Sequence, residues 1–314
     1  LIKNKNADTG LRLIISDALL PPGHGNRIFL DSYIDLIMDT GELPDIRAYA
    51  VYAIKSFQED GYPAVQALIS YLSETNQTEE NIRWGFDVIR SIGSKANSTI
   101  PILLHRLKAS SDGRTRQSAI FALASIGKSA TGAVPHLIDL IADTNNLMDL
   151  REVAIYALGK IGVYTPILIH ILSDTTEPYE IRREAILALR SFREEAAPAL
   201  PYLIKILGDV GADHEHRTSA ASAIGEIGIV DIESAIGLFM EIVGNKKESI
   251  ILKQGVIGAL RNLSRRLQEK QAIDALPHLI NARTLLAAPD FALQENPRIE
   301  SDVAEINVSI EALE

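Results

Sequence analysis

Small and aliphatic residues recur along the chain with the spacing of one buried helix face. In the clearest segment, apolar residues lie 3, 4, 6, 7 and 10 positions after Arg151. This spacing places them on one side of a helix with 3.6 residues per turn. The same pattern follows further basic residues that, by subtraction along the series, are 31 to 36 positions apart: Arg47, Arg83, Arg116, Arg182, Arg217 and Lys253. Self-similarity at this period indicates a repeat array.

Each unit also contains an earlier apolar segment, so that one repeat predicts two helices joined by a turn. In the unit at 133–162, Pro135 is placed in the first turn of a first helix, where proline is tolerated. The residues from Asp143 to Asn146 have turn chemistry, Asp149 can cap the second helix and Gly162 can end it. Stacked pairs of this kind predict an all-α fold, a right-handed α-solenoid of about eight helix pairs.

One repeat departs from this pattern. Counted from Arg83, the closing pair Ile92 and Gly93 arrives one residue early, and Trp84 begins a segment that replaces the usual Ala-Ile pair. We therefore expect a distorted or shifted second helix in this repeat.

The repeat resembles the HEAT repeat, and its Ala-Leu-Gly-x-Ile-Gly endings resemble the bacterial subtype called PBS-lyase HEAT-like; the resemblance covers about residues 27–288. It implies that repeated Asp and Arg side chains form a hydrogen-bonded ladder between neighbouring repeats, with a structural role. The residues that it assigns to the ladder are Asp39, Arg47, Asp143, Arg151, Asp174, Arg182, Asp209 and Arg217. The ladder is expected to lapse at Lys108 and Asn245, which occupy the Asp position in two repeats.

The ends of the chain differ from the repeats, and we expect one solenoid over residues 1–314 with a cap at each end. Residues 1–26 hold one short apolar helix, residues 27–270 form the regular repeats, and residues 271–314 form a last repeat and an acidic cap. The first residue is Leu1 and no secretory signal follows it, so we interpret the chain as a trimmed fragment.

Composition narrows the classes of function. Apolar residues make up 46% of the chain but aromatic residues only 5%, which predicts an aliphatic core. The chain has no Cys, which permits a cytoplasmic location and removes thiolate metal ligands. No apolar stretch reaches the roughly 20 residues that a membrane span needs. The net charge of −10 disfavours a protein that wraps nucleic acid. We find no motif for catalysis, for a metal or for another cofactor.

The candidate binding surface is the concave face that second helices line in HEAT solenoids. The outward positions are about 1, 2, 5, 8 and 9 residues after each repeat arginine. Aromatic and basic residues and one leucine lie at these positions or near them: Tyr49, Tyr52, Trp84, Arg90, Phe121, Tyr156, Lys160, Arg183, Leu187 and Arg190. These residue types dominate binding energy at interfaces and would suit an acidic, hydrophobic peptide or helix. The alternative is that they fill contacts between adjacent repeats while the charges face solvent.

Three functions are compatible with these features. The first is a non-enzymatic scaffold or recognition module that binds another protein, because the solenoid offers an extended surface and no reactive constellation. The second is a bilin-lyase-like or chromophore-handling subunit, which the PBS-lyase resemblance implies. The third is a HEAT-like DNA-binding protein or DNA glycosylase, for which Asp87 beside Trp84 resembles a catalytic carboxylate beside an aromatic ring. Its acidic charge and single Trp argue against this third function.

Overall fold

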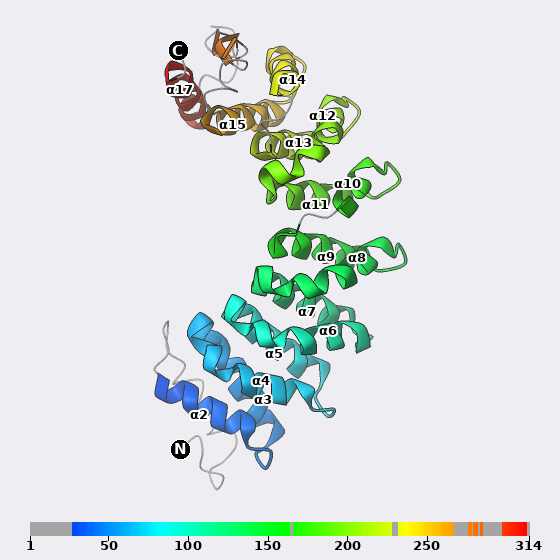
Figure 1. The fold of residues 1–314 in the computed structure, drawn as a ribbon, viewed down its shortest axis with the longest axis vertical. Coiled ribbons are helices and arrows are strands. Elements are labelled where there is room, and N and C mark those ends of the chain that lie inside the picture. Colours follow the sequence, from blue (N-terminus) through cyan, green and yellow to red (C-terminus); the bar gives the residue numbers. More distant parts are fainter. Residues whose placement is uncertain are drawn as a thin grey trace. The chain divides into compact units, whose positions relative to one another are not determined.

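The described part of the chain consists of paired helices that fall into two compact units. A computed structural model describes residues 27–163, 166–227, 232–266, 276–277, 279–281, 283–284 and 297–312 (Figure 1). Unit 1 is Leu1–Val163 and unit 2 is Tyr164–Glu314. The expected cap at residues 1–26 lies outside the described residues, as does most of the expected last repeat before residue 297. A single stack over the whole chain stays a prediction.

Unit 1 contains four pairs of helices within its described residues. The pairs are α2 (Arg27–Met38) with α3 (Pro44–Ile54), α4 (Val65–Ser73) with α5 (Glu79–Ile92), α6 (Ile100–Ala109) with α7 (Gly113–Ile126), and α8 (Val134–Ala142) with α9 (Met148–Ile161). Three 3₁₀ segments join one pair to the next: η1 (Lys55–Ala64), η2 (Gly93–Thr99) and η3 (Gly127–Ala133). The second helices pack side by side, α3 on α5, α5 on α7 and α7 on α9.

Unit 2 repeats this arrangement. Its described pairs are α10 (Pro166–Ser173) with α11 (Tyr179–Arg190), α12 (Leu200–Gly208) with α13 (His214–Ile227), and α14 (Ile232–Gly244) with α15 (Ile250–Arg266). The 3₁₀ segment η4 (Arg193–Ala199) joins α11 to α12, and α17 (Pro297–Glu311) packs on α15. The described residues include no strand, and the expected all-α solenoid fold is confirmed. None of the described helices combines the length and the apolar character that crossing a membrane requires.

The helix ends follow from local chemistry. Thr78 and Asp112 cap α5 and α7, because each side chain accepts a hydrogen bond from the amide three residues on. Gly162 ends α9 as expected: its φ is 76°, and its amide donates to the Leu158 carbonyl at 3.1 Å. The residue after the last core position has positive φ in five repeats: Gln58, Gly93, Gly127, Gly162 and Arg193.

The core lies along the helix faces that the apolar pattern predicts. In α9 the pattern residues are all buried: Ala154, Ile155, Ala157, Leu158 and Ile161. The side chains are small and aliphatic, so neighbouring helices approach closely. In α5, for example, a Cβ added at Gly85 would lie 2.7 Å from Cδ2 of Leu72. A larger residue there would require the Leu72 side chain to shift.

Of the two alternatives expected for the irregular repeat, the structure shows the shift and not the distortion. α5 is a regular 14-residue helix and is not distorted. What differs is register: Ile82, and not Arg83, is the fourth residue of α5, as Arg116 is of α7 and Arg151 of α9. Counted from Ile82, the buried residues fall at the usual places: Gly85, Phe86, Val88, Ile89 and Ile92. An apolar side chain thus replaces the repeat arginine, and Arg83 lies one position further along.

Candidate protein-binding surface

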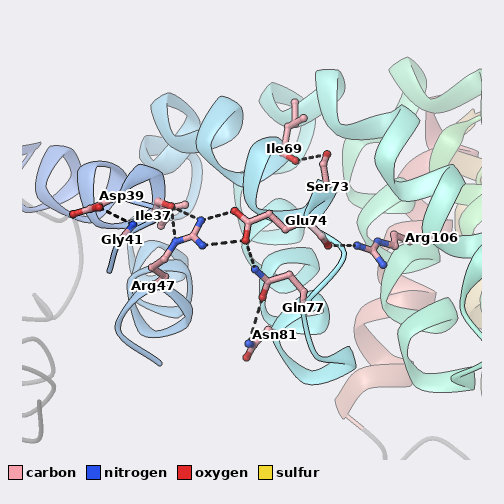
Figure 2. Close-up of polar contacts among 10 residues, drawn as sticks. All are labelled: Ile37, Asp39, Gly41, Arg47, Ile69, Ser73, Glu74, Gln77, Asn81 and Arg106. Carbon is pink, nitrogen blue, oxygen red and sulfur yellow. Dashed lines mark hydrogen bonds and ion pairs between the residues drawn. The ribbon is translucent and has the colours of Figure 1, made fainter. Parts of the chain in front are cut away.

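Three of the repeat arginines join the two helices of a pair. Arg47 donates from Nε and Nη2 to the Ile37 carbonyl, at 3.0 and 2.8 Å (Figure 2). Arg151 donates from Nε to Ile141 at 2.8 Å, and Arg217 donates from Nε to Leu207 at 2.9 Å. Each acceptor is the second-to-last residue of the first helix, where the backbone carbonyls have no intrahelical partner. A buried cation at this end of a helix is also favoured by the helix dipole.

Glutamates of the following repeat clamp two of these arginines. Glu74 accepts hydrogen bonds from Nη1 and Nη2 of Arg47 at 3.0 and 2.6 Å, and this lowers the pKa of Glu74 (Figure 2). Glu248 accepts from Nη1 and Nη2 of Arg217 at 2.9 and 2.8 Å. Both pairs are bidentate, which is the strong form of an arginine–carboxylate contact. The sequence reasoning missed both glutamates, because they lie in the turn of the next repeat.

The aspartates that the resemblance assigned to the ladder accept hydrogen bonds within their own turns, and their pairing with the repeat arginines stays a prediction. Asp143, Asp174 and Asp209 accept hydrogen bonds within their own turns, from the amides of Asn145, Thr176 and Gly211. Asp39 accepts in the same way from Gly41 at 3.0 Å (Figure 2). Asn245, where the ladder was expected to lapse, makes the same turn by accepting from the Lys247 amide. A side-chain oxygen that accepts a bond two residues on explains both Asp and Asn at this position.

Another arginine takes over where Ile82 replaces the repeat arginine. In this repeat the second-to-last residue of the first helix, α4, is Leu72. Ile82 has no side-chain donor and so cannot bind the Leu72 carbonyl as a repeat arginine would. Arg106 from α6 donates to it from Nη2 at 2.7 Å. The same Nη2 also donates to the Glu74 carbonyl at 3.1 Å (Figure 2). The polar connection is therefore kept, although the sequence position of the donor has changed.

In unit 1 the predicted aromatic residues form two groups on the second helices. The rings of Tyr49 and Tyr52 lie 6.3 Å apart, and those of Tyr52 and Trp84 lie 5.7 Å apart between α3 and α5. The rings of Phe121 and Tyr156 lie 6.0 Å apart between α7 and α9. Tyr52 is 43% exposed and Tyr156 is 40% exposed, so these rings fill the space between neighbouring helices and also reach solvent.

Two predicted cations lie on the second aromatic group. The Arg90 guanidinium is 5.1 Å from the centre of the Phe121 ring, and the Lys160 ammonium is 5.5 Å from that of Tyr156. Both side chains are exposed, and among the described residues neither has a carboxylate partner. Lys55, in contrast, pairs with Asp87 at 3.0 Å. The aromatic carboxylate site that Asp87 and Trp84 suggested therefore has a lysine on its carboxylate.

In unit 2 the corresponding face is polar and hollowed. Leu187 is 37% exposed, Arg183 pairs with Glu184 at 3.5 Å, and Arg190 forms an ion pair with Glu226. Ser222 and Gly258 lie where the second helices of unit 1 carry Tyr52, Phe121 and Tyr156. These small residues help to line a cavity of about 420 Å³ that also includes Arg190 and Glu226. The predicted residues of unit 2 thus do not continue an aromatic surface.

The structure offers no group of side chains suited to a metal ion: within the residues that it describes, no three His, Cys, Asp or Glu come together in this way. His216 is buried, its ring lies 5.0 Å from the Tyr179 ring in a tilted arrangement, and burial lowers its pKa to about 4. It is therefore a neutral core residue.

Sequence comparison identifies the repeat in part of the chain. Residues 100–178 match the family model for HEAT repeats. No curated protein sequence matches the chain.

Solved structures with the same architecture include natural and engineered solenoids. An engineered protein is 19% identical with a TM-score of 0.56, over 98% of this chain and 89% of that one. Importin beta is 13% identical with a TM-score of 0.60, over 96% of this chain and 45% of its own. The karyopherin Kap121p, bound to the extreme C-terminus of the protein phosphatase Cdc14p, is 15% identical with a TM-score of 0.59, over 91% of this chain and 34% of its own. The chain thus spans less than half the length of either karyopherin, and these similarities show the fold.

Proposed function

We propose that the chain is a non-enzymatic protein-interaction module, and that its partner binds the second helices of unit 1. The binding surface consists of Tyr49, Tyr52, Trp84, Arg90, Phe121, Tyr156 and Lys160, which we call the aromatic surface. The observation that carries this proposal is the arrangement of exposed cations over aromatic rings on neighbouring helices. Such rings contribute large contact areas at little cost in side-chain entropy, and arginine adds charge and hydrogen bonds. We assign the aromatic surface to the concave face of a PBS-lyase HEAT-like solenoid.

Charge selects the chemistry of the partner. The outward positions of the second helices of unit 1, together with Lys55 at the start of η1, carry four cations and two carboxylates: Lys55, Arg83, Arg90 and Lys160 against Asp87 and Glu152. Asp112, which pairs with Arg83 at 2.9 Å, adds a third carboxylate, so this face has a local excess of one positive charge in a chain of net charge −10. A segment with acidic and hydrophobic side chains would therefore be attracted to this face and repelled from the rest of the chain. A peptide of the extreme C-terminus of another protein is what Kap121p binds in one of the similar structures, and we extend only the mode of binding to this chain.

The test is selection of peptides from a random displayed library with the purified chain. We expect selected peptides to be enriched in Asp or Glu and in aliphatic or aromatic residues, and their binding to weaken as salt is raised. A variant with Tyr52, Trp84, Phe121 and Tyr156 changed to Ala should lose this selection while keeping its helicity by circular dichroism. The matched control changes Tyr62 and Tyr202 to Ala, because both are exposed aromatic residues that lie outside the aromatic surface.

Equal selection by the wild type and the quadruple variant would reject the aromatic surface as the site. Enrichment of basic peptides would reject the proposed chemistry of the partner. Capture from a lysate of the source organism, with the same two variants, would then identify the natural partner by mass spectrometry.

A further inference from the structure

One repeat arginine in unit 1 differs from the clamped ones. Within the described residues, the Arg116 side chain has no hydrogen bond and no ion pair. Arg47 and Arg217 are at most 7% exposed, and each binds a carbonyl and a glutamate. Arg116 is half-buried instead and lies at the same fourth position of its helix. A guanidinium has five N–H donors in a fixed planar arrangement. In Arg116 none of these donors binds an acceptor among the described residues.

A shorter turn accounts for the missing carbonyl contact. Three residues, Ser110 to Asp112, separate α6 from α7, whereas five residues separate α2 from α3 and α8 from α9. The second-to-last residue of α6 is therefore Lys108, eight positions before Arg116, where the other repeats have a spacing of ten. This also corrects the earlier alignment, because the residue that follows the first helix in this repeat is Ser110, not Lys108.

The missing carboxylate has a separate cause in the next turn. Glu248, which clamps Arg217, is the fourth residue of its turn. Its backbone amide donates to the carbonyl of the first turn residue, Asn245, at 3.1 Å. Asn146 holds that position after α8, where its amide donates to the Asp143 carbonyl at 3.0 Å. Asn146 is neutral, and its side chain donates to the Leu140 carbonyl. The residue that would clamp Arg116 is thus replaced by one that carries no carboxylate.

A cavity of about 270 Å³ lies at this place. Its polar lining includes Arg116, Lys108, His136 and Asn146 together with Asp139 and Asp143. Arg116 and Lys108 are two positive charges, and Asp143 is held in its own turn by Asn145. The lining thus carries two cations and two carboxylates, and the Arg116 guanidinium lies where a glutamate binds the arginine in other repeats.

We propose that this cavity binds one carboxylate of a ligand, which Arg116 holds as Arg217 holds Glu248. Asp139 and Asp143 in the same lining disfavour a doubly charged group such as phosphate and favour a carboxylate that adjoins an N–H or ammonium donor. An acidic residue of a polypeptide and a free amino acid share this chemistry. The site is separate from the aromatic surface, and its failure would leave the proposed function unchanged.

The test is a titration of the whole chain followed by NMR at the amide signals of α7. The probes are the blocked tripeptide acetyl-Ala-Glu-Ala-amide, free L-glutamate, the matched acetyl-Ala-Gln-Ala-amide, and inorganic phosphate. We expect saturable shifts with one or both glutamate probes and none with the glutamine probe; the probe that binds more tightly identifies the source of the carboxylate. Arg116→Gln should weaken this binding about tenfold or more, because it removes a charge-assisted pair.

Asn146→Glu provides an independent test, because it is expected to stabilise the fold and so its effect on binding cannot be ascribed to unfolding. Its carboxylate should occupy the cavity from within, abolish binding of the glutamate probes and raise the melting temperature. Asn146→Gln, of the same length but neutral, should still bind them. No shift with either glutamate probe, tighter binding of phosphate, or unchanged binding by Asn146→Glu would overturn the proposal.

Discussion

The clamp between Arg217 and Glu248 gives the sharpest test of what holds neighbouring repeats together. The Arg217 side chain is 3% exposed and that of Glu248 is 9% exposed, and two hydrogen bonds join them. Glu248→Gln keeps the shape but removes the charge and one acceptor, so Arg217 is left as a buried, uncompensated cation. Removing one partner of a buried pair costs about 3–5 kcal/mol of unfolding free energy. An exposed pair would cost about 1 kcal/mol or less.

Native-state hydrogen exchange of the amides in α13 and α15 measures this cost locally, which suits a repeat array that need not unfold in one step. A loss of 3 kcal/mol corresponds to exchange about a hundredfold faster. The control is Glu59→Gln, because Glu59 pairs with Lys95 at 3.3 Å and the two side chains are 72% and 47% exposed. The double variant Arg217→Met, Glu248→Leu should recover most of the loss, since no charge stays buried. The reasoning is refuted if Glu248→Gln and Glu59→Gln accelerate exchange equally.

Three further variants test other features. Gln58 adopts φ 51° and ψ −131°, close to Gly93 at 68° and −136°, so Gln58→Gly should raise the unfolding free energy by about 1 kcal/mol in urea unfolding, while Gln58→Ala should not. Ala212 is the fourth residue of its turn, the position from which Glu248 binds Arg217, and the arginine of the preceding repeat is here Arg182. Because Nε of Arg182 is buried without a hydrogen bond among the described residues, Ala212→Glu should raise the melting temperature more than Ala212→Gln. His216 is unprotonated in the folded state down to about pH 4 but has an ordinary pKa of 6.5 when unfolded, so stability is full above pH 6.5 and falls by up to about 3 kcal/mol towards pH 4. His216→Gln should flatten that pH profile, and an unchanged profile would assign the loss to other groups.

The fold was predictable because its pattern is local and repeated. Apolar residues three, four, six, seven and ten positions after the arginine lie on one helix face, and the pattern recurs from repeat to repeat. A departure in one repeat therefore does not change the fold that the other repeats predict. The end of α9 was equally predictable, because Gly162 ends it in the left-handed conformation that the sequence indicates.

The contacts of the arginines were less predictable, because their partners lie in another repeat. Glu74 is 27 positions after Arg47, and Glu248 is 31 positions after Arg217. No local rule distinguishes these glutamates from others on the surface. The family resemblance supplied Asp as the partner, and the four aspartates that it named accept from the amide two residues on in their own turns. An aspartate does hold an arginine of the preceding repeat elsewhere, because Asp112 accepts from Nη1 of Arg83 at 2.9 Å.

The register of α5 explains why Trp84 belongs to the candidate surface. Counted from Arg83, Trp84 stands one position after the repeat arginine and has no counterpart. Counted from Ile82, it stands two positions after it, which is the position of Tyr49 in α3. The ring of Tyr52, five positions after its arginine, then lies between Tyr49 and Trp84. Contact between α3 and α5 thus places a five-position ring beside a two-position ring, whereas Phe121 and Tyr156, which contact between α7 and α9, are both five-position residues. Unit 2 carries Ser222 and Gly258 at the five-position, and the same geometry there produces a cavity.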